Sequence, residues 1–60
     1  MNKETMPKFL TAKHVADLLD ISKSSAYRII KKLNSELEND GKIIIAGKIS
    51  SRYFYEKVYL

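Results

Sequence analysis

The sequence predicts a mostly α-helical fold with one small β-hairpin, and three observations carry this prediction. Two segments, 12–19 and 23–38, place apolar residues at helical spacing, and each follows a residue able to cap a helix. Only three residues, 20–22, separate these segments. A β-branched run and a glycine-containing turn come after the second segment. Because so short a connection prevents two helices from continuing in line, they form a helix-turn-helix.

The first predicted helix follows Thr11, whose side-chain oxygen can accept from the unpaired N–H groups of the first turn. Leu10 and Val15 have the spacing of a hydrophobic staple across this helix start. Val15, Leu18 and Leu19 follow the i, i+3, i+4 pattern. We therefore expect this helix to bury these three side chains on one face.

The second predicted helix, 23–38, begins after Ser22, another capping residue. Ile21 and Ala26 repeat the staple spacing, and residues 39–41, Asn-Asp-Gly, end the helix. Apolar residues recur along it at steps of three or four, which marks one face as buried. This stripe consists of Ala26, Ile29, Ile30, Leu33 and Leu37.

The opposite face of the second helix is basic and rich in hydroxyl groups over its N-terminal half. Its side chains supply donors that suit phosphate oxygens and the N7 and O6 atoms of guanine. Acidic residues fill only the C-terminal end, which would lie away from a duplex. The pattern predicts a DNA-recognition helix. Its exposed face comprises Ser24, Arg28, Lys31 and Ser35, with Tyr27 and Lys32 on the flanks.

A short wing is predicted over residues 42–50. The β-branched run 43–45 forms one strand, Ala46 and Gly47 offer a turn, and 48–50 returns as the second strand. Positive charge on this hairpin would suit the DNA backbone or the minor groove beside the recognition helix. The charged residues are Lys42, Lys48 and Arg52.

The C-terminal segment, about 51–59, fits two structures. Ser50 or Ser51 can cap a helix in which Phe54 faces inward, and we favour this helix. A continued hairpin is nearly as well supported, because residues 53–55, Tyr-Phe-Tyr, are strand formers.

We expect one domain, 9–60, preceded by a flexible arm, 1–8, that is polar and has no helical stripe. A chain of 60 residues has room for a single core of roughly a dozen apolar side chains. The expected core consists of Leu10, Val15, Leu18, Leu19, Ile21, Ala26, Ile29, Ile30, Leu33, Leu37, Ile44, Phe54 and Val58.

Composition limits the functional classes further. The net charge is +4 and the isoelectric point is about 9.5, which suits a polyanionic partner. The absence of cysteine excludes disulfides and thiolate zinc sites and fits a reducing cytosol. Because the sequence has neither a membrane-spanning apolar run nor a signal-peptide core, we expect a protein of the bacterial cytoplasm or nucleoid.

The residue inventory does not support catalysis. His14 is the only histidine, and it lies one turn from Asp17 on a short exposed helix with no pocket around it. The acidic residues lack the spacing of a calcium loop, and no glycine-rich phosphate loop is present. The C-terminal tyrosines lack the Arg and His companions of a recombinase nucleophile. We therefore expect no enzyme, metal site, cofactor or small-molecule substrate.

The segment TAKHVADLLDISKSSAYRIIKKL resembles the helix-turn-helix of small bacterial and phage DNA-binding proteins. Ala16 matches the small residue of the first helix, and Asp20 stands at the turn position that is usually Gly, followed by Ile21 and Ser22. With the wing and a closing helix, the whole chain resembles excisionases and related winged helix-turn-helix regulators of phages and integrative elements. This resemblance implies either DNA bending that helps an integrase assemble, or a regulator that blocks or recruits polymerase.

The predicted mechanism places the second helix in the major groove of double-stranded DNA. The side chains nearest the bases are Ser24, Tyr27, Arg28 and Lys31. Those that position the DNA backbone are Thr11, Lys13, Ser22, Lys23 and Lys32, and the wing adds Lys42, Lys48 and Arg52. Because one helix reads too few bases to select a site in a genome, we expect further copies on adjacent sites or a second protein such as an integrase.

A different class of function remains open. The helix pair could be a protein-interaction module, such as an antirepressor that binds another regulator through its basic face. Arg28 separates the two classes, because its replacement weakens DNA binding only if it contacts DNA.

Overall fold

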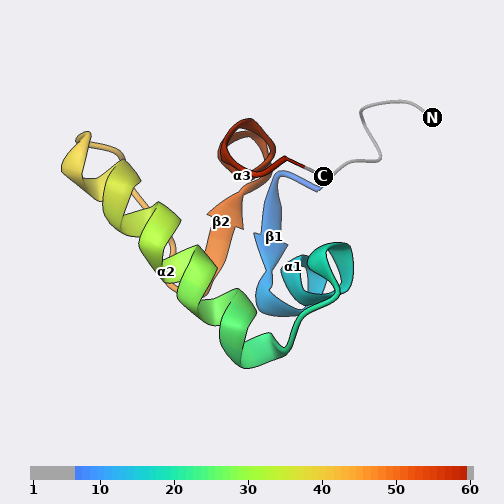
Figure 1. Ribbon diagram of the computed structural model, residues 1–60. Coiled ribbons are helices and arrows are strands. Elements are labelled where there is room, and N and C mark those ends of the chain that lie inside the picture. Colours follow the sequence, from blue (N-terminus) through green and yellow to red (C-terminus); the bar gives the residue numbers. More distant parts are fainter. Residues whose placement is uncertain (1–6, 60) are drawn as a thin grey trace.

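The computed structural model describes residues 7–59 of the chain. Its elements follow the order β1 (Phe9–Thr11), α1 (Ala12–Leu19), α2 (Lys23–Asn39), β2 (Lys48–Ser50) and α3 (Ser51–Lys57). Figure 1 shows the long helix α2 crossing one side of the small sheet, with α1 and α3 near opposite ends of the strands. This is the mostly helical winged helix-turn-helix expected from the sequence.

Helix α1 has the predicted bounds because both of its ends are fixed locally. Thr11 Oγ1 accepts from the backbone N–H of His14 at 3.4 Å, while Thr11 N–H donates to His14 Nδ1 at 3.2 Å, which forms a capping box. At the other end Asp20 adopts a left-handed conformation with φ 56°. The N–H groups of Asp20 and Ile21 both donate to the carbonyl of Ala16. The turn between α1 and α2 is thus closed by backbone hydrogen bonds.

Helix α2 extends one residue beyond the prediction. Ser22 caps its start by accepting from the N–H of Ser25 at 3.2 Å. Its C-terminus closes where Gly41 takes a positive φ of 82°, with Lys42 N–H donating to Leu37 O at 2.9 Å and Gly41 N–H to Glu38 O at 3.0 Å. These two bonds form a Schellman motif, which explains why Gly41 ends the helix.

The second predicted strand, Lys48–Ser50, is present as β2, but its partner differs from the prediction. It pairs antiparallel with β1, placing Leu10 opposite Ile49, and residues 43–45 have no regular secondary structure. Ile43 is 96% exposed. β1 was not predicted because Phe9–Thr11 is short and precedes the first helix, far from β2 along the chain.

The connection before β2 explains why residues 43–45 do not pair with it. Lys48 N–H donates to Ile45 O at 3.1 Å and closes a four-residue turn. This turn has a positive φ at Gly47, 79°, but not at Ala46. A positive φ at the second central position alone is typical of type II turns, which splay the flanking strands apart, whereas tight hairpins use type I′ or II′ turns.

The core lies between the sheet and the three helices. Most expected side chains are buried or packed against it, but Leu18 is 42% exposed, which corrects the prediction. The inward face of α1 includes Ala12, Val15 and Ala16, and Leu18 points about 100° away from the neighbouring Leu19. Ile44 is only half-buried and lies outside the core cluster. Ile49, which the prediction omitted, is completely buried.

The C-terminal segment forms a helix, α3, and not a continued hairpin. Ser50 caps it by accepting from Tyr53 N–H at 3.4 Å, and Phe54 is completely buried. The helix ends at Lys57, two residues before the expected end, because Val58 is extended.

Residues 1–6 of the predicted arm lie outside the described residues. The last two positions of that arm are tied to the start of α3. Buried Ser51 donates from Oγ to Pro7 O at 2.5 Å and from its N–H to Lys8 O at 2.9 Å.

Candidate nucleic-acid interface

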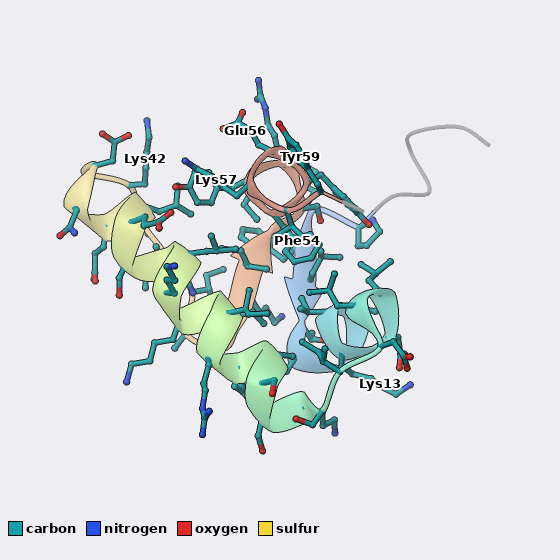
Figure 2. The ribbon with its side chains drawn as sticks, viewed as in Figure 1. Lys13, Lys42, Phe54, Glu56, Lys57 and Tyr59 are labelled. Carbon is teal, nitrogen blue, oxygen red and sulfur yellow. The ribbon has the colours of Figure 1, made fainter. Side chains whose placement is uncertain are left out.

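The outward face of α2 carries the predicted base-contacting side chains, and all four are exposed. Ala26, Ile30 and Leu33 turn toward the core, so residues half a turn away project into solvent. Figure 2 shows nitrogen-tipped side chains extending from α2 on the side away from the sheet. The exposed set consists of Ser24, Tyr27, Arg28 and Lys31.

The cations of this face are available to an external anion. Within residues 7–59, neither Arg28 nor Lys31 forms an ion pair with a carboxylate. Lys23 is exposed in the first turn of the same helix, where backbone N–H groups add partial positive charge. The N-terminal half of α2 therefore presents an exposed basic face, as expected from the sequence.

Lys32 lies on the other flank of α2. It lines a groove with Leu19, Ile29 and the α3 residue Lys57. Lys31, by contrast, lines a separate groove beside the wing. The two neighbouring lysines therefore line different grooves, as expected for side chains about 100° apart around the helix.

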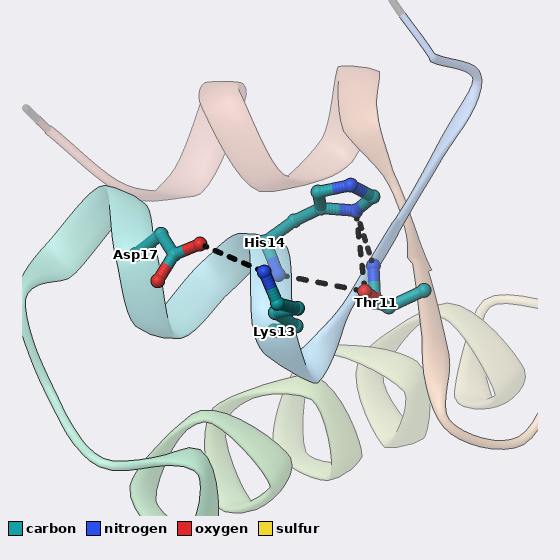
Figure 3. Close-up of polar contacts among 4 residues, drawn as sticks. All are labelled: Thr11, Lys13, His14 and Asp17. Atoms are coloured by element: carbon teal, nitrogen blue, oxygen red, sulfur yellow. Dashed lines mark hydrogen bonds and ion pairs between the residues drawn. The ribbon is translucent and has the colours of Figure 1, made fainter.

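The predicted backbone contacts at the helix starts have different surroundings. The hydroxyls of Thr11 and Ser22 are already engaged as caps, and Ser22 Oγ also donates to Ser25 Oγ at 3.1 Å. Lys13 is exposed and forms a loose ion pair with Asp17, with Nζ 3.9 Å from Oδ2 (Figure 3). An exposed pair of this kind contributes little stability, so Asp17 does little to fix the position of the Lys13 ammonium group.

The turn of the wing lies beside the recognition helix. A groove of about 420 Å³ separates them. Tyr27, Lys31 and Ser35 form its helix wall, and Ala46 and Gly47 form part of its wing wall. The structure therefore brings the wing next to the exposed face of α2.

The three cations predicted for the wing lie in different surroundings, and Arg52 belongs to α3 rather than to the wing, which corrects the prediction. Lys48 is exposed on β2, opposite Thr11 of β1. Lys42 and Arg52 line a groove of about 400 Å³ with Tyr53 and Glu56. Figure 2 shows Lys42 extending on the side of the molecule where Glu56 and Lys57 of α3 project. This groove shares no lining residue with the groove between α2 and the wing turn.

Asn34 is a residue of this region that sequence reasoning missed. It is 6% exposed, and its Nδ2 donates to the backbone oxygens of Ile45 at 3.3 Å and Lys48 at 2.8 Å. Its position beside Leu33 and one turn after Ile30 was the available signal, because an amide within an apolar stripe needs buried partners.

The acidic end of α2 has a structural role. Tyr53 of α3 donates its hydroxyl to Glu36 Oε1 at 2.8 Å. This hydrogen bond is the main cause that raises the pKa of Tyr53 above its ordinary value, with desolvation and nearby carboxylates adding to it. Lys57 Nζ lies 5.5 Å from the centre of the Tyr53 ring. Tyr53 therefore joins α3 to α2.

Comparison with known proteins shows the family. The profile of the Mga helix-turn-helix domain matches residues 3–59. The chain belongs to this family. It is also 35% identical over 49 residues to the ICEBs1 excisionase of Bacillus subtilis (strain 168), an alignment that covers 82% of this chain and 77% of the relative. No solved structure matches.

These matches confirm the resemblance to excisionase-like helix-turn-helix proteins of mobile elements. Helix-turn-helix domains are DNA-binding modules rather than a class of enzymes. Among residues 7–59, no helix has the length and apolar character needed to cross a membrane.

Proposed function

We propose that this excisionase-like protein binds double-stranded DNA at specific sequences, with α2 in the major groove. The observation that carries the proposal is the exposed face of α2, on which Arg28 and Lys31 have no carboxylate partner among residues 7–59. That face follows a three-residue turn within a helix-turn-helix domain. This arrangement is how such domains present their second helix to base edges.

Base recognition rests on the N-terminal half of α2. Arg28 can donate two parallel hydrogen bonds to O6 and N7 of guanine, and Lys31 can donate to the same acceptors. Ser24 and Tyr27 add hydroxyl groups on either side. Lys13, Lys23 and Lys32, with Thr11 and Ser22 at the helix starts, would contact the phosphates and fix the orientation of α2.

The wing would contact the groove that flanks the recognition helix. Lys48 lies on β2, which follows the turn beside α2. Lys42 and Arg52 would extend this contact along the DNA backbone. Phosphate contacts of this kind strengthen binding without reading sequence.

Several copies would occupy adjacent sites. One recognition helix offers three or four side chains to base edges, and a genome presents on the order of a million or more competing sites. Side-by-side binding would bend the DNA and help a separate integrase assemble, as the similarity to a named excisionase suggests. The same binding could also regulate transcription by blocking or recruiting polymerase.

The proposal is tested by selecting duplexes from a random-sequence library with the wild-type protein and footprinting the recovered DNA. Arg28→Ala should lower affinity for that duplex by about 1–3 kcal/mol. Lys57→Ala is the matched control, because it removes an exposed cation from α3. If Arg28→Ala binds the duplex with unchanged affinity, the result would favour a protein partner instead. A wild-type footprint confined to one short site with full affinity would contradict the binding of several copies.

A further inference from the structure

Asn34 belongs to the recognition helix, but its side chain binds the wing. Both hydrogen bonds from Nδ2 end on main-chain carbonyls, those of Ile45 and Lys48. Because both partners can only accept, the NH₂ group and not the amide oxygen must face them. One buried side chain of α2 therefore donates to two backbone oxygens that lie 11 and 14 residues further along the chain.

The two carbonyls belong to the two ends of a single turn. Ile45 and Lys48 are its first and last residues, joined by the hydrogen bond from Lys48 N–H to Ile45 O at 3.1 Å. A contact at one end would let the turn swing, whereas contacts at both ends fix its orientation. The turn is held so that Ala46 and Gly47 line the groove opposite Tyr27.

The two sides of the turn differ in what else supports them: Lys48 at its C-terminal end is the first residue of β2 and pairs with Thr11, whereas its N-terminal side has little support besides Asn34. Residues 42–45 belong to no helix or strand, and Ile43 and Ile45 are both exposed. Hydrophobic burial does not require an amide at position 34 either, because a leucine there would extend the stripe of Ile30 and Leu33. An amide is required only where the carbonyls of the turn must be held.

We propose that Asn34 is a positioning residue that sets the place of the wing turn relative to α2, and thereby allows both to contact one DNA site at the same time. The inference rests on the proposed DNA binding. Asn34 itself is buried below the groove and would not contact bases. It would act through the exposed groups on either side, Lys31 on the helix and Lys48 on the wing.

The test compares the wild-type protein with Asn34→Leu and with the control Ile30→Val. Ile30→Val removes one buried methyl group from the same helix and leaves both hydrogen bonds to the turn intact. All three proteins are measured on a duplex selected by the wild type, at a temperature where circular dichroism shows each to be folded. The readouts are affinity, salt dependence and the hydroxyl-radical footprint.

Asn34→Leu should bind the selected duplex about tenfold more weakly, because the wing loses one contact with the DNA. The slope of log K against log salt should also become shallower by about 1. Protection at the flanking groove should disappear while protection at the centre of the site remains. Ile30→Val should keep the wild-type slope and footprint.

Unchanged slope and footprint in Asn34→Leu would overturn the positioning role while leaving the proposed function in place. Failure of the wild-type protein to enrich any duplex would overturn the proposed function, and this inference with it.

Discussion

Leu10 and Ile49 lie directly opposite each other across β1 and β2, and both side chains are buried. This pair joins the segment before the first helix to the segment before the last one. Because β1 leads into α1 and β2 leads into α3, the contact places both helices against the same core. The two strands therefore connect the helix-turn-helix to the C-terminal helix, in addition to the bond between Tyr53 and Glu36.

The pairing predicts that replacing Ile49 lowers the stability of the protein far more than replacing Ile43. Ile49→Ala should lower the free energy of unfolding by about 2–5 kcal/mol, because it leaves a cavity in the core. A domain of this size has a total stability of only about 3–9 kcal/mol, so much of the protein should unfold. Ile43→Ser should change stability by less than about 0.5 kcal/mol, because Ile43 is 96% exposed. Urea denaturation measures both, and similar losses in the two variants would contradict the observed pairing.

The helices could be predicted from the sequence because their signals are local. Thr11 and Ser22 lie next to the helices they cap, and Gly41 lies next to the end of α2. The partner of β2 could not be predicted in this way. Pairing between Leu10 and Ile49 depends on how α1 and α2 fold between them, whereas residues 43–45 offered a nearer run of β-branched side chains.

In the candidate interface, too, the features set by local sequence could be predicted, and those set by distant contacts could not. Helical periodicity alone predicted that Arg28 and Lys31 would be exposed, since the apolar stripe fixes which side faces the core. The contacts of Asn34 and Tyr53 reach across 11 residues or more, so the local sequence does not identify their partners, even though the place of Asn34 in the apolar stripe marks it as buried. Tertiary packing therefore determined the parts of the site that sequence reasoning missed.

Asp20→Gly should stabilise the protein. Asp20 has a φ of 56°, a left-handed conformation that costs most residues energy but not glycine. We expect the free energy of unfolding to rise by up to about 1 kcal/mol, reduced by the greater entropy of glycine in the unfolded chain. Asp17→Gly is the control, because Asp17 lies within α1 and its replacement should lower stability by about 0.5 kcal/mol. Thermal unfolding of both variants tests this, and a destabilised Asp20→Gly would show that the aspartate side chain has a further role.

The bond between Tyr53 and Glu36 predicts a dependence on alkaline pH. The pKa of Tyr53 is raised above 10.0, chiefly because its hydroxyl donates to the Glu36 carboxylate. The folded state therefore holds the phenol proton more tightly than the unfolded chain. The contribution to stability should be complete below about pH 10 and should be lost as the pH rises through the folded-state pKa.

Urea denaturation of the wild type and Tyr53→Phe across this pH range measures the contribution of the bond. The wild type should be the more stable protein at neutral pH, and the gap should close in alkali. Glu36→Gln should move the ultraviolet titration of the phenol to lower pH. A gap that stays constant with pH would show that ionisation of Tyr53 is not coupled to folding.

The salt dependence of DNA binding should show whether a given cation of α2 contacts a phosphate. If four to six cationic groups meet phosphates, log K should fall against log salt with a slope of about −4 to −5. Lys31→Ala should make this slope shallower by about 1 if Lys31 contacts a phosphate, whereas a contact to guanine would lower affinity with a smaller change in slope. Lys57→Ala removes the same charge from α3 and should leave the slope unchanged. Equal changes in the two variants would mean that net charge, and not the position of Lys31 on the recognition helix, determines binding.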